Sequence, residues 1–176
     1  MGSPWINVHH VLEVSDPDAA HHRGADPHVL LCSKSGTLGG VELRMAMEAR
    51  LLKRSGYQAS VAINMHPLLV EWAEELRKGA IPVMDFAPAP FMEQWRWRHL
   101  NRLRAKYLST RFLRRTRPDL MHVFLPWTDF GGTRLWLADH CGIPSVISVR
   151  QIFSRATWSP WHKWHYREAF RSVRGI

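Results

Sequence analysis

The sequence predicts an α/β fold in which a Rossmann-like parallel sheet is flanked by helices, and two observations support this prediction. Between residues 28 and 151, apolar runs of strand length alternate with longer amphipathic segments, an order typical of βαβ units with right-handed crossovers. Runs such as "HVLLCS" at 28–33 are continuously apolar, as a strand buried on both faces requires. Parallel sheets bind ligands beyond the carboxyl ends of their strands, so we expect a site in the residues that follow each strand.

The predicted elements follow one another at short intervals. After the strand "HVLLCS", a helix is expected from residue 41, because Val41, Met45, Ala49 and Leu52 fall on one helical stripe. The later strands are predicted as "ASVAIN", "IPVMDF", "LMHVFLP" and "PSVISVR". The intervening helices are predicted as "LLVEWAEELRKG", the long segment 91–117 and "FGGTRLWLADHCG". The stretch from residue 151 to residue 176 is predicted as a loop and then a helix.

Two parts of the chain differ in character. Residues 1–27 carry prolines, acids and two histidine pairs, and they are predicted as a flexible N-terminal extension. Residues 28–176 are predicted as a single domain, and the hydrophobic content of 45% is ordinary for a globular protein. No apolar run is long enough for a transmembrane helix, and the start lacks a signal-peptide pattern. We therefore expect a cytoplasmic protein with two reduced cysteines.

The loop "GTLGGVE" at 36–42 joins the first strand to the first helix, where glycine loops commonly approach a phosphate. A nucleoside-triphosphate loop needs Gly-Lys-Ser/Thr, whereas Gly40 is followed by Val41 and Glu42. A dinucleotide fingerprint, as in nicotinamide-dependent oxidoreductases, needs G-x-G-x-x-G and an acid after the second strand, whereas that strand ends in Asn64. Two interpretations remain, a loop whose backbone amides face an anion and a plain tight turn.

Two long segments, "GGVELRMAMEARLLKRSGYQASVAI" and "RPDLMHVFLPWTDFGGTRLWLADHCGIPSVISVR", follow one another along the chain. The first resembles the first βα unit of the family 4 glycosyltransferases of the GT-B fold, and the second is similar to the partner segment of that unit. The resemblance covers residues 28–176 and implies one half of a GT-B fold, the N-terminal, acceptor-side domain. It implies transfer of a sugar from a nucleotide-sugar donor to a sugar or lipid-linked acceptor. The donor would be held mainly by a C-terminal domain outside this chain, so the isolated chain is expected to be inactive.

The resemblance also assigns roles to individual positions. Gly39 and Gly40 match the family's loop that faces the donor diphosphate across the cleft between the domains. His122 matches the first histidine of a His-x-His pair and is the candidate catalytic residue. The second position of that pair is Phe124, so the pair is incomplete. The alternative for His122 is a hydrogen-bonded core histidine.

Three residues at the ends of predicted strands are expected to line the acceptor cleft: Asn64, Trp127 and Arg150. Arg150 stands where the family often has a histidine, and an arginine pairs well with a phosphate or an acidic acceptor; the alternative is a solvated strand end. No cofactor and no metal site are expected. The pattern "HKWH" at 162–165 puts two histidines on one helix face but lacks the glutamate of H-E-x-x-H.

The formal net charge of +9 implies an anionic partner. Between Phe91 and Pro118, nine cations stand against one acid and alternate with aromatic and leucine side chains. Such a basic amphipathic helix suits an anionic membrane surface, at the inner face of the membrane for a cytoplasmic protein. The residues predicted to meet it are Trp95, Trp97, Arg96, Arg98 and Arg102. The alternative is a helix with solvated arginines whose apolar side packs on the sheet.

A non-enzymatic basic domain that binds nucleic acid or a membrane surface is the second functional hypothesis. The cations gather on one helix, and no RNA-recognition, zinc-finger or helix-turn-helix signature accompanies them. We therefore expect no nucleic-acid partner.

Overall fold

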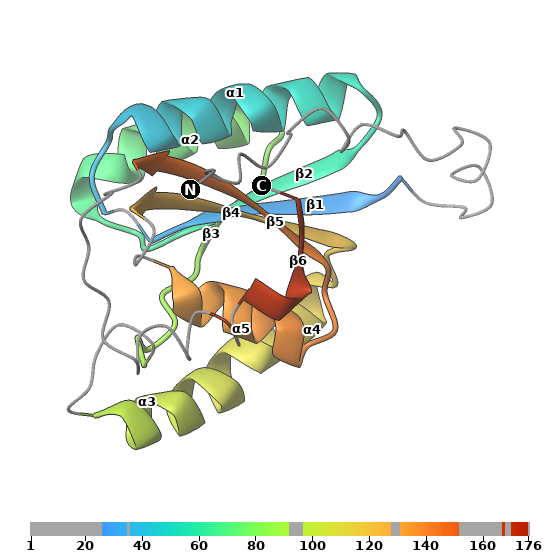
Figure 1. The fold of residues 1–176 in the computed structure, drawn as a ribbon. Helices are drawn as coiled ribbons and strands as arrows, with labels where there is room; N and C mark the ends of the chain where they lie inside the picture. The colour runs from blue at the N-terminus through green and yellow to red at the C-terminus, as the bar shows by residue number, and fades with distance from the viewer. Residues whose placement is uncertain are drawn as a thin grey trace, which may run out of the picture.

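Six parallel strands form one sheet. The computed structural model of the protein describes residues 26–34, 36–91, 97–127, 131–151, 167 and 170–175. The strands pair in the order β3-β2-β1-β4-β5-β6 (Figure 1). Their bounds are β1 His28–Ser33, β2 Gln58–Ile63, β3 Val83–Asp85, β4 Leu120–Trp127, β5 Ser145–Gln151 and β6 Val173–Gly175. The chain winds outward from β1 to one edge and then from β4 to the other, so these two strands meet at the centre.

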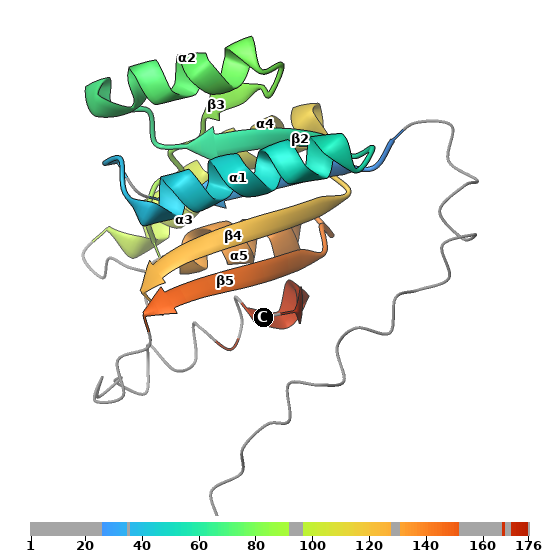
Figure 2. The same ribbon diagram turned by 90° about the horizontal axis from the view of Figure 1, so that it is seen from above.

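The helices form a layer on each face of the sheet. Helices α1 (Gly40–Arg54) and α2 (Val70–Lys78) cover one face. Helices α3 (Arg98–Arg104), α4 (Thr110–Thr116) and α5 (Gly132–His140) cover the other (Figures 1 and 2). The π-helical segment η4 (Ala105–Ser109) joins α3 to α4 without a break, and the 3₁₀ turns η3 (Pro67–Leu69) and η5 (Phe170–Ser172) precede α2 and β6.

The core lies on both sides of the sheet, as the continuous apolar runs predict. Along β1, Leu30 and Cys32 pack in the cluster beneath α5, whereas Val29 and Leu31 pack in the cluster beneath α1 and α2. All four side chains are buried. A strand that alternates its side chains between two packed layers has no solvent face, which is why its sequence shows no polar alternation.

The five predicted strands and the helices predicted near residues 41–55, 68–79 and 130–142 are confirmed, with three differences. The long helix predicted over residues 91–117 is helical from Arg98 to Thr116, whereas Phe91 and Trp97 lie outside any helix and residues 92–96 lie outside the described ranges. The third strand is only three residues long. The prediction of a loop and a helix after residue 151 is wrong at its end, because residues 173–175 form β6 beside β5. A strand this short carries no periodicity, and it exists because β5 offers it an unpaired edge. Residues 1–25, 92–96 and 152–166 lie outside the described part of the chain.

Glycine is required where α5 begins. Gly131 has a φ of +135°, and a Cβ there would lie 2.4 Å from Cδ2 of Leu125 on β4. An L-residue would meet both a strained backbone and a clash. The close approach places the first turn of α5 directly against the sheet, beneath the ends of the strands.

Candidate functional site

The residues that follow the strands gather at one end of the molecule. The arrowheads of β4 and β5 and the beginning of α1 lie at the same end (Figure 2). Because all the strands are parallel, the segments after β1, β2, β3, β4 and β5 share this carboxyl edge. The fold therefore brings the glycine loop and the strand ends together, as the sequence predicts.

The glycine loop caps the first turn of α1. Gly39 is extended, and its backbone N–H donates to Oε2 of Glu42 at 2.9 Å. Glu42 is 1% exposed, and its Oε1 has no hydrogen-bond partner among the described residues. The first helical bond runs from the Leu43 amide to the Gly39 carbonyl oxygen at 3.1 Å. One of the two amides expected to face a phosphate is thus taken by the protein's own carboxylate, and the amides of Gly40 and Val41 remain without an intrahelical acceptor.

A buried arginine on α5 forms hydrogen bonds to residues at the carboxyl edge of the sheet. Arg134, in the first turn of α5, is 2% exposed. Its Nη2 donates to Oδ1 of Asn64 at 2.6 Å and to the carbonyl oxygen of Phe86 at 3.0 Å. The residues just after β2 and β3 are therefore tied to α5. Asn64, which the sequence predicts in the acceptor cleft, has its amide oxygen directed to this arginine.

Sequence reasoning missed Arg134. The available signal was a charged residue in the first, mostly apolar part of the helix, two positions after Gly132, because a buried cation must find several acceptors. The same guanidinium acts on Cys32, a free thiol in β1. Burial raises the pKa of the Cys32 thiol to about 12, although the nearby Arg134 works in the opposite direction. Cys32 is therefore an inert core residue.

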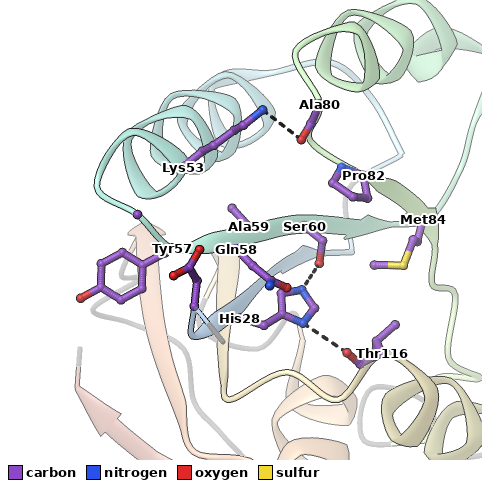
Figure 3. Close-up of a pocket in the computed structure, with 12 residues that line it drawn as sticks. His28, Lys53, Tyr57, Gln58, Ala59, Ser60, Ala80, Pro82, Met84 and Thr116 are labelled. Atoms are coloured by element: carbon purple, nitrogen blue, oxygen red, sulfur yellow. Dashed lines mark hydrogen bonds between the residues drawn. The ribbon is translucent and has the colours of Figure 1, made fainter. Parts of the chain in front are cut away.

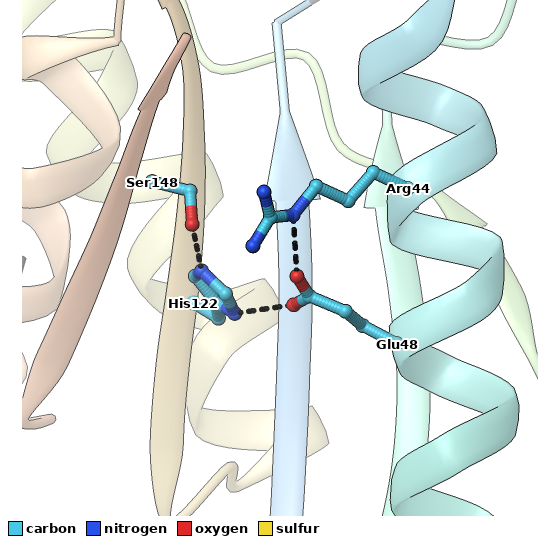
Figure 4. A network of polar contacts seen from close by, with 4 residues as sticks. All are labelled: Arg44, Glu48, His122 and Ser148. Carbon is cyan, nitrogen blue, oxygen red and sulfur yellow. Dashed lines mark hydrogen bonds and ion pairs between the residues drawn. The ribbon is translucent and has the colours of Figure 1, made fainter.

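His122 forms the centre of a polar network that joins three elements (Figure 4). Its Nδ1 lies 3.1 Å from Oε2 of Glu48 on α1, and its Nε2 lies 2.9 Å from Oγ of Ser148 on β5. Glu48 also accepts a hydrogen bond from Nε of Arg44 at 2.7 Å. The ring of Phe124 stacks on the imidazole with 4.2 Å between centroids.

The environment keeps the His122 imidazole neutral at neutral pH. Burial lowers the pKa of His122 below its usual value, Glu48 opposes this shift, and Arg44 adds to it. In the neutral ring, Nδ1 donates to the Glu48 carboxylate and Nε2 accepts from the Ser148 hydroxyl. Both ring nitrogens are therefore engaged inside the protein.

A pocket connects the glycine loop to this network. It has a volume of about 240 Å³ and lies between the start of α1 and the ends of β4 and β5. Gly40, Arg44, Phe124 and Ser148 are among the residues that line it. The structure therefore brings the predicted phosphate-facing loop and the hydroxyl bonded to His122 to one cavity.

A second pocket, of about 580 Å³, lies at the opposite, amino edge of the sheet (Figure 3). Three of its polar side chains, those of His28, Ser60 and Lys53, have protein partners. Nε2 of His28 lies 2.7 Å from Oγ of Ser60, Nδ1 lies 3.2 Å from the Thr116 carbonyl oxygen, and Nζ of Lys53 donates to the Gly79 carbonyl oxygen at 2.8 Å. No residue of the glycine loop or the His122 network lines this pocket.

The remaining predicted site residues are described only in part. Trp127 is the last residue of β4 and Arg150 is the last but one of β5, but the structure describes only their backbone, as it does for Arg98. Trp95 and Arg96 lie outside the described residues, as does the "HKWH" pattern. Within the described ranges, no group of three or more histidine, cysteine or acidic side chains could hold a metal ion.

The basic helix predicted for a membrane surface is partly exposed. Trp97 is 59% exposed at the start of α3. The guanidinium of Arg102 lies 5.1 Å from the ring centroid of Trp136 on α5, so this cation holds α3 against the domain. None of the helices in the described ranges has the length and apolar character to cross a bilayer.

Comparisons with known proteins identify the family to which the chain belongs. Residues 39–174 match the family described as "Glycosyl transferase 4-like domain". The chain therefore belongs to the glycosyl transferase 4-like domain family, and the resemblance seen in the sequence is confirmed. A search of curated proteins finds no match.

Two solved structures of low sequence identity share the fold. MurG from Acinetobacter baumannii is 20% identical with a TM-score of 0.52, and the match covers 80% of this chain and 39% of MurG. HepE from Anabaena, solved with UDP, is 18% identical with a TM-score of 0.54, and the match covers 81% of this chain and 35% of HepE. The chain thus spans well under half the length of these structures. The likeness confirms the predicted Rossmann-like half of a GT-B fold.

The partly buried His122 makes stability depend on pH. Its pKa is lowered in the folded protein, so as the pH falls below about 6.5 the unfolded chain takes up the proton first. The free energy of unfolding is expected to fall with pH in this range, by at most about 1.4 kcal/mol per pH unit for this one group. Urea denaturation at pH 7.5 and at pH 5.5 gives the free energy of unfolding at each pH. The difference between these two free energies should be smaller for His122→Gln than for the wild-type chain. An unchanged difference in the variant would contradict this assignment.

Proposed function

We propose that the chain is the acceptor-side domain of a glycosyltransferase that moves a sugar from a nucleotide-sugar donor to an acceptor hydroxyl. The observation that carries the proposal is the family match over residues 39–174, together with the glycine loop at the carboxyl edge of a parallel sheet. HepE, which shares the fold, was solved with UDP. A nucleoside diphosphate is the leaving group that the proposed reaction requires.

The glycine loop would stabilise that leaving group. Negative charge grows on the diphosphate as the bond to the sugar breaks, and fixed amide dipoles aimed at it lower the barrier. The amides of Gly40 and Val41 begin α1, whose N-terminus carries partial positive charge. Glu42 holds the loop in place through the Gly39 amide. Arg44, one turn further along, adds a cation beside the pocket.

The proposed role of His122 in catalysis is indirect. Both of its ring nitrogens are bonded within the protein, so a substrate can exchange a proton with it only through Ser148. We keep Trp127 and Arg150 as candidates for acceptor contact, because β4 and β5 end at the same edge. Asn64 would shape the floor of the cleft through its bond to Arg134.

An experiment with the donor-binding lobe supplied in trans tests the proposal. The chain is co-expressed with a nucleotide-sugar-binding lobe, and UDP-, GDP- and dTDP-sugars are screened for release of nucleoside diphosphate. Gly40→Pro removes one amide at the first helical position, where proline fits, and should slow release by about 10²-fold. Gly40→Ala keeps the amide and should retain most activity.

Two outcomes of this experiment would contradict the proposal. The first is the absence of any release that depends on both lobes. The second is an equal rate for Gly40→Pro and Gly40→Ala, which would mean that the amide does not face the leaving group.

We further propose that α3, η4 and α4 attach the domain to an anionic membrane, at its cytoplasmic face. The inner side of this segment packs in the core through Ala105 and Leu113. On the outer side, Leu100, Leu103 and Tyr107 are 60%, 66% and 76% exposed. Their spacing of three and four residues puts them on one side of the segment.

Cations accompany this outer apolar side. Besides Arg102, which lies over Trp136, the exposed basic residues of the segment are Arg104, Lys106, Arg111, Arg114 and Arg115. Each can contribute about 1 kcal/mol near an anionic surface. The mixture of leucine and tyrosine with the cations favours a bilayer over nucleic acid, because phosphate backbones offer no apolar phase for leucine side chains.

Vesicle flotation tests the membrane proposal. The chain should float with vesicles that contain phosphatidylglycerol, and less so at 0.5 M salt. The double variant Leu103→Glu/Tyr107→Glu should lose most binding. Met47→Glu is the matched control, since Met47 is 68% exposed on α1, on the other face of the sheet. The proposal would be contradicted if both variants lost vesicle binding equally. It would also be contradicted if the chain bound an oligonucleotide and did not bind vesicles.

A further inference from the structure

Ser148, His122 and Glu48 lie in the order of a nucleophilic triad. The hydroxyl Oγ lies 2.9 Å from Nε2 of the imidazole, and Nδ1 of the same ring lies 3.1 Å from the carboxylate (Figure 4). The three groups come from β5, β4 and α1. A nucleophile bonded to a base that is itself oriented by a third group is the geometric signature of covalent catalysis.

The base in this arrangement is held from several sides. Arg44 binds the second carboxylate oxygen of Glu48 at 2.7 Å, which fixes the carboxylate. Phe124 stacks on the imidazole at 4.2 Å, which fixes the plane of the ring. The imidazole can therefore neither turn away from Ser148 nor exchange its two nitrogens. Such restraint is what an oriented base requires.

Ser148 also faces a cavity that can take a substrate. It lines the pocket of about 240 Å³ together with the apolar side chains Phe124, Leu125 and Val149. The cation Arg44 and the first two residues of α1, Gly40 and Val41, complete the wall. The apolar part suits a short acyl chain, and the cation and the helix N-terminus suit negative charge next to it.

We propose that Ser148 is a base-activated nucleophile that accepts short acyl groups from activated esters, an activity separate from glycosyl transfer. Oγ of Ser148 attacks the carbonyl carbon while its proton passes to Nε2 of His122. The carbon–oxygen bond of the ester breaks, and the alcohol leaves with that proton. Water then attacks the acyl-serine, His122 takes the proton of the water and returns it to Ser148, and the carboxylic acid is released.

A second serine in the same molecule provides an internal comparison. Ser60 lies 2.7 Å from Nε2 of His28, but Nδ1 of that histidine faces the carbonyl oxygen of Thr116 at 3.2 Å, in place of a carboxylate. Ser60 is also 3% exposed. It lines the pocket at the amino edge, but its histidine partner lacks the orienting acid, so it should not react.

A fluorophosphonate probe tests the proposal on the chain alone. Oγ attacks phosphorus, the P–F bond breaks and fluoride leaves, so the adduct is read by intact mass and mapped by peptide sequencing. One adduct is expected, on Ser148. Ser148→Ala should abolish it, Glu48→Gln should slow it at least about tenfold, and Ser60→Ala should leave its rate unchanged. Heat-denatured protein should not be labelled.

Several results would overturn the proposal. They are no labelling of the folded wild-type chain at millimolar probe, labelling that persists in Ser148→Ala, and an unchanged rate in Glu48→Gln. Circular dichroism of each variant shows that it is folded. If Ser148→Ala fails to fold, the mapped adduct on the wild-type chain and the Glu48→Gln rate still decide the question. The result does not depend on a second lobe or a sugar donor, so it stands apart from the glycosyltransferase proposal.

Discussion

The shared direction of the strands is the constraint on which the rest of this structure depends. Because every strand is parallel to its neighbours, every segment that follows a strand reaches the same edge. The order places β1 beside β4, and α1 therefore starts above the centre of that edge. A buried cation, Arg134, then ties the ends of β2 and β3 to α5. The position of the site follows from the topology, and Arg134 links three of the elements around it.

Helix α1 contributes different polar groups to the two proposed activities, glycosyl transfer and acyl transfer to Ser148. At the start of α1, Glu42 satisfies the Gly39 amide and leaves the amides of Gly40 and Val41 for an external anion. One turn and two turns later, Arg44 and Glu48 point to β4 and orient His122. A single helix thus has unpaired amides at its first turn, where we propose that a leaving group binds, and presents a carboxylate to a histidine from its middle. Gly40 and Ser148, one from each of these two groups of residues, line the same pocket of about 240 Å³.

Much of the fold could be predicted from the sequence, because buried parallel strands have a distinctive apolar pattern. The exceptions have physical reasons. Strand β6 is too short for periodicity and depends on pairing with residues nearly thirty positions away. The partners of His122 could not be predicted, because Glu48 on α1 and Ser148 on β5 are far from it in the sequence and meet it only in the folded protein. Arg134 was missed because burial of a cation depends on acceptors supplied by distant loops. His122 itself was found through the family resemblance, and its two bonds show why sequence alone left its role open.

The central claim is that the start of α1 faces a nucleoside diphosphate, and amide spectra test it most directly. In an assigned ¹H–¹⁵N spectrum of the chain in complex with a nucleotide-sugar-binding lobe, millimolar UDP should shift the resonances of Gly40 and Val41. The resonances of Tyr57 and Ser60, in the pocket at the opposite edge, should stay in place. Shifts confined to that opposite edge, or no shift at the start of α1, would contradict the account.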